Sequence, residues 1–196
     1  MAQFIASDTK APATVVSRGF CGARSGRIYK AMFSEKGETF KDILTKAPHF
    51  CIVAVGVNDT YTKTGANAYA KNVIQIIQLL LSGDIIPIII EIPSYNIKEA
   101  FERQTIQKKM LRRLSMLVTD SNIDCITAYR KELENKLQRN NLYDSIIYIR
   151  SRYWDDSPKL YNSDCLHLND NGYRQLDSCI AQRIAAYVSV KSLCHQ

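Results

Sequence analysis

Residues 50–55, Phe-Cys-Ile-Val-Ala-Val, form a continuous apolar run that stops at Gly56. A short run of this kind, bounded by glycine, is typical of a strand buried on both faces of a parallel sheet. A second run, Ile85–Ile92, is rich in β-branched residues and is followed by Pro93, which predicts a central strand. Between the two, Tyr69–Leu81 carries apolar residues at helical spacing. This order predicts a βαβ unit.

The same alternation continues on both sides of this unit. We expect short strands at Ala13–Ser17 and Ile123–Thr127, and helices at Ala100–Ser121, Tyr129–Gln138 and Asp170–Val190. Strands that alternate with helices indicate a mainly parallel sheet covered by helices on both faces. The predicted fold class is therefore α/β, a three-layer α/β/α sandwich.

The composition fits a globular chain. Of the 196 residues, 46% are hydrophobic and 23% are charged, and no repeat or linker divides the sequence, so we expect one domain over residues 1–196. The net charge of +7 raises the question of a nucleic-acid partner. The basic residues are spread along the chain, and their one local cluster, residues 108–113, falls in a predicted helix. We therefore interpret it as a solvated helix face and do not expect nucleic acid as the partner.

Several other classes of protein lack support. No apolar run approaches the roughly 20 residues of a membrane-spanning helix, and the N-terminus does not resemble a signal peptide. The six cysteines form no C-x-x-C pair, which favours a reducing, cytoplasmic compartment. His49 and His195 have no ligand-type partner at metal-binding spacing, and no phosphate-binding glycine loop follows a strand. We expect neither a metal nor a cofactor.

Polar residues and glycines follow the predicted strands, at the sheet edge where α/β proteins bind ligands. Residues 17–26 contain three glycines, and a backbone N–H of such a turn can donate to an oxyanion; a plain strand-to-helix turn is the alternative. Asn58 follows Gly56 and offers an amide donor, or else caps a turn. Asp164 precedes His167 by three residues, so its carboxylate can hold the imidazole as a base; a cap and a packing histidine are the alternative.

Together these three segments resemble the SGNH hydrolase (GDSL-like lipase/esterase) family. S-R-G-F-C-G at 17–22 is similar to the second block of that family, G-V-N-D at 56–59 to the third, and D-C-L-H at 164–167 to the fifth. The resemblance implies a serine-type ester hydrolase. It also implies that Gly22 and Asn58 form the oxyanion hole, that His167 is the base, and that Asp164 orients it.

The first block of the family, G-D-S with the nucleophilic serine, is not found. The nearest string is Ala6-Ser7-Asp8, but a strand over 2–6 would leave only residues 7–12 for a crossover that needs about a dozen. We therefore expect residues 2–7 to be the end of a helix, with the family's first strand preceding Met1. Ser7 remains a weak candidate for the nucleophile, and Ser25 a weaker one, in a turn or early helix.

The expected substrate is a small-molecule or carbohydrate-linked acyl ester. An O-acetyltransferase would use the same groups, and a protein that has lost its nucleophile would bind a ligand without turnover. Arg150, Arg152, Tyr153 and Trp154 precede the D-x-x-H loop. They either contact an anionic or sugar substrate or form a packed aromatic with solvated arginines.

Overall fold

The computed structural model describes residues 1–33, 43, 45–46, 48–62, 64–93, 106–107, 110, 126–155, 157–164 and 166–193. Helices and strands alternate along this part of the chain. In chain order, the elements are α1 (Ala2–Thr9), α2 (Ser25–Phe33), β1 (Phe50–Val53), α4 (Val57–Tyr61), α5 (Ala66–Ser82), β2 (Ile86–Ile90), α8 (Ile126–Arg139), the 3-10 helix η1 (Tyr143–Ser145), β3 (Ile147–Ile149), the 3-10 helices η2 (Ser151–Tyr153) and η3 (Pro158–Leu160), and α9 (Asp170–Leu193).

The described strands form one parallel sheet in the order β1-β2-β3. Phe50 of β1 is in register with Ile86, and Ile88 of β2 is in register with Ile147. Since the strands are parallel, the loops that follow them leave from the same edge of the sheet. That edge carries the turns and loops in which the sequence predicts a site.

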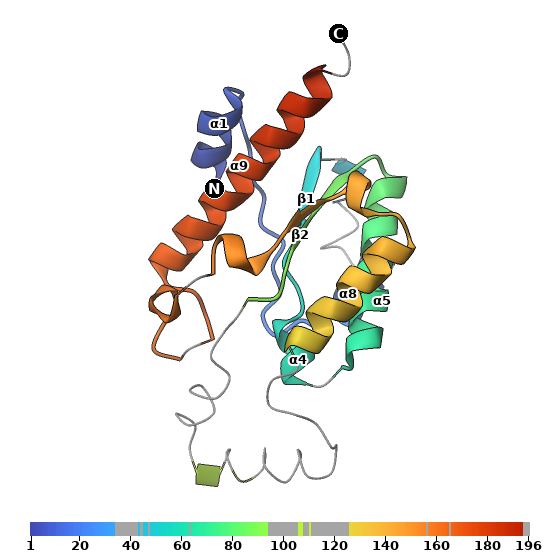
Figure 1. Cartoon of the computed structure of the whole chain (residues 1–196), viewed down its shortest axis with the longest axis vertical. Helices are drawn as coiled ribbons and strands as arrows, with labels where there is room; N and C mark the ends of the chain where they lie inside the picture. Colours follow the sequence, from blue (N-terminus) through green and yellow to red (C-terminus); the bar gives the residue numbers. More distant parts are fainter. Residues whose placement is uncertain are drawn as a thin grey trace.

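Helices cover both faces of the sheet (Figure 1). On one face α5 packs against α8 and α2, and on the other α1 packs against α9. Two buried clusters follow this division, one centred on α5 and α8 and one on α9. The predicted three-layer α/β/α architecture is confirmed.

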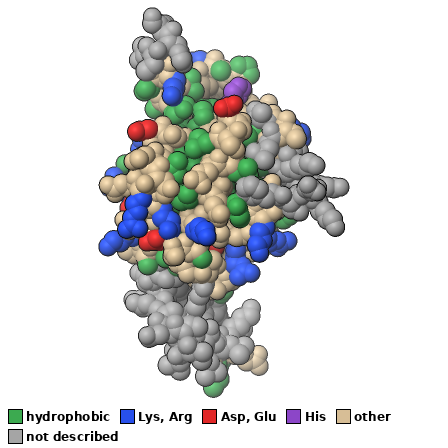
Figure 2. Space-filling view, turned by 90° about the vertical axis from the view of Figure 1, so that its right-hand side faces the viewer, with side chains coloured by type: hydrophobic (Ala, Val, Ile, Leu, Met, Phe, Trp, Pro, Cys, Tyr) green, Lys and Arg blue, Asp and Glu red, His purple; other side chains and the backbone are tan. Residues whose placement is uncertain are grey.

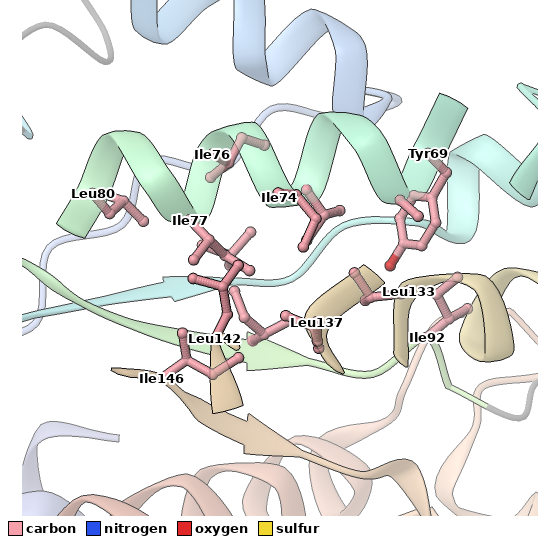
Figure 3. Close-up of a cluster of buried hydrophobic side chains, with 14 of the residues drawn as sticks. Tyr69, Ile74, Ile76, Ile77, Leu80, Ile92, Leu133, Leu137, Leu142 and Ile146 are labelled. Carbon is pink, nitrogen blue, oxygen red and sulfur yellow. The ribbon is translucent and has the colours of Figure 1, made fainter. Parts of the chain in front are cut away.

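The larger cluster shows why these sequences form these elements. Residues of α5 at helical spacing point toward the strands, where they meet side chains of α8 and Ile92, which follows β2 (Figure 3). Spacing of this kind gives a helix one apolar face, and burial of a large aliphatic side chain contributes about 1.5–3 kcal/mol. The fully buried members include Tyr69, Ile76, Ile77, Leu80, Leu133 and Leu137.

Most expected elements occur where the sequence placed them. Runs 50–55 and 85–92 contain β1 and β2, residues 69–81 and 129–138 lie within α5 and α8, and 170–190 lies within α9. The expected helical segment at residues 2–7 is part of α1. The helix expected at 100–121 and the strand expected at 123–127 lie mostly outside the described residues. Residues 126–127, the last two of that expected strand, belong to α8.

The strand expected at Ala13–Ser17 is wrong. The segment has no strand structure, and its Val15 and Val16 are 44% and 62% exposed. β-branched residues favour a strand only where a neighbouring strand accepts its hydrogen bonds. No strand of the described sheet pairs with this segment. β3 (Ile147–Ile149) is not among the predicted strands, although Ile146–Ile149 forms an apolar run rich in β-branched residues.

Lys and Arg side chains gather in a band across the side of the molecule on which α5 and α8 lie (Figures 1 and 2). Residues 108–109 and 112–113 of the basic cluster lie outside the described residues.

Within the described ranges, no helix is long and apolar enough to cross a membrane.

Candidate active site

The D-x-x-H segment lies in a closed loop between η3 and α9. An isolated antiparallel bridge pairs Tyr161 with Leu168 and closes the loop at its base. The backbone N–H of Asn162 donates to the His167 carbonyl at 2.8 Å, and that of Asn169 donates to the Leu160 carbonyl at 2.8 Å. The loop therefore projects from a defined base and presents Asp164 and His167 together.

Asn169 joins this loop to the start of α9. Its side-chain oxygen accepts hydrogen bonds from the backbone N–H groups of Asn171 (3.0 Å) and Gly172 (3.1 Å), which satisfies donors of the first helical turn. Its amide nitrogen donates to the carbonyls of Lys159 (2.7 Å) and Tyr161 (3.1 Å). One side chain thus caps α9 and fixes the base of the loop.

Asp164 and His167 form a direct pair. Asp164 Oδ2 lies 2.6 Å from His167 Nδ1, and Oδ1 accepts from the backbone N–H groups of Leu166 and His167, both at 3.0 Å. The hydrogen bond from the His167 ring, followed by those two backbone bonds, lowers the pKa of Asp164 from 3.8 to about 2. The side chains are 48% and 66% exposed, so a ligand can reach the imidazole.

The second half of the candidate site follows β1. Gly56 has φ +124 and leads directly into α4, on which Asn58 lies. Asn58 Nδ2 donates to the Ala23 carbonyl at 3.1 Å. Gly22, with φ +68, occupies the turn in which the Ala23 N–H donates to the Phe20 carbonyl at 3.3 Å. The structure therefore brings the glycine turn and Asn58 together.

The two halves lie at the same edge of the sheet. α4 follows the end of β1, and the loop before α9 follows the end of β3, so both leave from the carboxyl ends of parallel strands (Figure 1). Val57, which precedes Asn58, and Leu166, which precedes His167, both pack against the cluster centred on α5 and α8. This is the edge where the sequence predicts ligand binding.

The candidate nucleophiles Ser7 and Ser25 lie on α1 and at the start of α2. Ser7 lies exposed on α1, which packs along α9. The ammonium group of Met1, the residue before α1, is 2.9 Å from Asp177. From Met1, α1 runs toward the C-terminal half of α9, away from the loop that precedes α9 (Figure 1). Ser25 is fully buried, and its Oγ donates to Asp59 Oδ1 at 2.7 Å. Ser7 thus lies on the helix that packs along α9, and Ser25 is enclosed beside Asp59 with no exposed surface.

The residues before the loop divide into packed and solvated ones. Trp154 is 1% exposed and belongs to the cluster on the α9 side, so it cannot contact a substrate. Arg150 pairs with Glu134 at 3.1 Å, and Arg152 donates to the Tyr153 hydroxyl at 3.1 Å. Trp154 is thus the packed aromatic of the second alternative, whereas Arg152 and Tyr153 lie exposed.

Sequence reasoning missed Glu91, which anchors the end of β3. Glu91 follows β2, is 7% exposed, and accepts hydrogen bonds from the Ser151 backbone N–H (2.7 Å) and the Tyr148 hydroxyl (3.1 Å). Burial next to this carboxylate raises the pKa of Tyr148. A single acidic residue inside an apolar strand run was the available signal, because a buried charge needs partners.

No family model matches the sequence, and no curated protein matches it. Solved structures do match. A GDSL-like lipase from Bacteroides thetaiotaomicron VPI-5482 superposes with a TM-score of 0.59 and 15% identity, over 85% of this chain and 73% of that one. A candidate acylhydrolase from Bacteroides fragilis NCTC 9343 superposes with a TM-score of 0.56 and 16% identity, over 85% and 72%. The chain shares its α/β/α fold with these two proteins.

Proposed function

We propose that this protein is an ester hydrolase acting on a small or carbohydrate-linked acyl ester, with His167 as general base. The observation that carries the proposal is the Asp164–His167 pair at 2.6 Å, on an exposed loop at the carboxyl edge of a parallel sheet. The resemblance of the three sequence blocks to SGNH hydrolases supports the same activity. The names of the two structural neighbours, a lipase and an acylhydrolase, agree with it.

The pair determines which imidazole nitrogen does the chemistry. With a pKa of about 2, the Asp164 carboxylate is ionised at neutral pH and only accepts hydrogen bonds. In the neutral imidazole that acts as base, His167 Nδ1 therefore carries the proton that points to Asp164, and the lone pair lies on Nε2. Nε2 takes the proton of the hydroxyl whose oxygen bonds to the ester carbonyl carbon, and gives it to the alcohol oxygen when the ester C–O bond breaks. Where that hydroxyl belongs to a serine, a water molecule attacks the acyl-enzyme by the same route and releases the acid and the serine.

The developing oxyanion would be held at the other half of the site. An amide nitrogen carries two N–H groups, so the bond from Asn58 Nδ2 to the Ala23 carbonyl uses one and leaves a second donor. The other proposed donor to the oxyanion is the backbone N–H of Gly22. Two such donors aimed at the charge that forms in the transition state are the usual requirement for acyl transfer.

The test is hydrolysis of p-nitrophenyl acetate by the purified chain, by His167→Ala and by His49→Ala. His49 is exposed at the start of β1, the opposite end of the strand, and serves as the matched control. We expect His167→Ala to lose about 10²–10⁴-fold in kcat/KM and His49→Ala to match the wild type. Equal rates for His167→Ala and the wild type would contradict the proposal.

One alternative has an observation in its favour. Ser25 is fully buried against Asp59, and Ser7 lies on α1, which runs away from the loop that carries His167 (Figure 1). A protein of this fold without a nucleophile would bind an ester and not cleave it. Labelling with a fluorophosphonate separates the two, since this reagent modifies an activated serine. Labelling that requires His167 supports the hydrolase; binding of the ester with neither labelling nor turnover supports the alternative.

A further inference from the structure

A buried polar cluster lies behind the proposed oxyanion donors. Asp59 and Ser25 are both 0% exposed. Asp59 Oδ2 accepts from the Ser25 backbone N–H at 2.9 Å, and Oδ1 accepts from the Ser25 hydroxyl at 2.7 Å. Asn72 Nδ2 donates to Ser25 Oγ at 3.1 Å. Side chains from α2, α4 and α5 thus meet in one hydrogen-bonded group.

The cluster joins the two segments that carry the proposed oxyanion donors. Asp59 directly follows Asn58 on α4, and Ser25 begins α2 three residues after Gly22. The bidentate contact between Asp59 and Ser25 therefore sets how far the Asn58 side chain lies from the Gly22 turn. The bond from Asn58 to the Ala23 carbonyl lies between these two points and depends on the same spacing.

Apolar packing alone would not hold this spacing so narrowly. Hydrogen bonds of a buried carboxylate are directional, and the group is costly to bury unless its oxygens are satisfied, so the cluster permits few alternative arrangements. A further bond from the Tyr129 hydroxyl to the Asp59 carbonyl, at 3.2 Å, ties α4 to α8. These hydrogen bonds to α2 and α8 fix the five-residue helix α4 from two sides.

We propose that Asp59 is a positioning residue, which through Ser25 holds the Asn58 amide and the Gly22 turn at the separation that one oxyanion requires. The use of these donors in catalysis rests on the proposed function. The claim that Asp59 fixes the position of the Asn58 amide does not rest on that function, and an NMR measurement tests it separately.

The experiment compares Asp59→Ala, Asp59→Asn and Ser25→Ala with the control Thr60→Ala. Thr60 is the next residue of α4 and is 5% exposed, and its hydroxyl donates within the helix to the Val57 carbonyl at 2.8 Å. The readout is the ¹⁵N–¹H NMR signal of the Asn58 side-chain amide and its rate of hydrogen exchange. Amide signals of Ile88 and Ile149 report whether the sheet is intact.

We expect Asp59→Ala to move the Asn58 signal and to raise its exchange rate at least about tenfold, with the signals of Ile88 and Ile149 unchanged. Asp59→Asn keeps one acceptor for the Ser25 N–H, so its Asn58 signal and exchange rate should lie between those of the wild type and of Asp59→Ala. Ser25→Ala removes only the hydroxyl bond and tests the same contact if Asp59→Ala does not fold. Where an ester is hydrolysed, kcat should fall with KM nearly unchanged.

An unchanged Asn58 signal in Asp59→Ala and Ser25→Ala would overturn the proposal. An equal change in Thr60→Ala would also overturn it, because any loosening of α4 would then have the same effect. If the NMR changes occur as expected but the wild type hydrolyses no ester, the proposed function fails while the positioning role of Asp59 stands.

Discussion

Replacing Gly56 by alanine should destabilise the protein strongly. Gly56 has φ +124, a backbone conformation that residues with a Cβ rarely adopt. A Cβ there would lie 2.5 Å from Ile92 Cγ1 and 3.0 Å from Tyr69 Cε2. Both neighbours are 1% exposed within the core (Figure 3), so neither can move without disturbing its own packing.

Two costs add in this variant. Forcing a side chain into a strained backbone region costs about 1–3 kcal/mol. Overpacking a closed core costs about 1–3 kcal/mol more. We therefore expect Gly56→Ala to lower the free energy of unfolding by about 4 kcal/mol, a large fraction of the 5–15 kcal/mol typical of a domain.

The assay is equilibrium unfolding in urea, with Gly65→Ala as the matched control. Gly65 also has a positive φ, +90, but nothing lies within 4 Å of its Cβ position, so only the backbone cost applies. With a slope of about 2 kcal/mol per molar urea, the Gly56→Ala midpoint should fall by about 2 M. A loss no greater than that of Gly65→Ala would refute the steric argument.

Three further outcomes follow from the site. NMR should show the Asp164 carboxyl titrating near pH 2, because its hydrogen bonds to His167 and to the loop backbone lower its pKa. The stability that these bonds contribute is therefore complete above pH 3.8 and is lost as the pH falls through about 2. In His167→Ala the titration midpoint should rise, and an unchanged midpoint would contradict the pairing. Asn169→Ala should cost about 1–2 kcal/mol in urea unfolding through the lost α9 cap, whereas a loss below about 0.3 kcal/mol would speak against that role. Asn58→Ala should reduce kcat for ester hydrolysis about 10²–10³-fold with KM little changed, and a pure KM effect would exclude it as an oxyanion donor.

The strands and helices predicted correctly are those with a strong pattern of their own. The run at 50–55 and the spacing of Tyr69–Leu81 require burial wherever the chain folds, so β1 and α5 follow from the sequence. Ala13–Ser17 has equally β-branched residues but no strand beside it in the described sheet, and a strand depends on its neighbour as much as on its residues. β3 is only three residues long and was missed for lack of a longer pattern.

In the candidate site, contacts between residues close in the sequence could be predicted, and contacts between distant residues could not. Asp164 and His167 are three residues apart, so their contact is a local property of the sequence and was predicted. The contact of Asn58 with Ala23 spans 35 residues, and that of Asp59 with Ser25 spans 34. No local pattern encodes such distances. The resemblance to a family pointed to Asn58 and Gly22, whereas the cluster behind them became visible only in the fold.

The account depends most on the two halves of the site facing the same ligand, and a crystal structure measures this directly. If His167 Nε2 and Asn58 Nδ2 serve one ester group, their separation is at most roughly 8 Å, the sum of two hydrogen bonds of about 3 Å and the width of an acyl group. We predict a separation within that limit, with both atoms open to the same solvent-filled space. A separation well beyond it, or a side chain of the core between the two, would contradict the account.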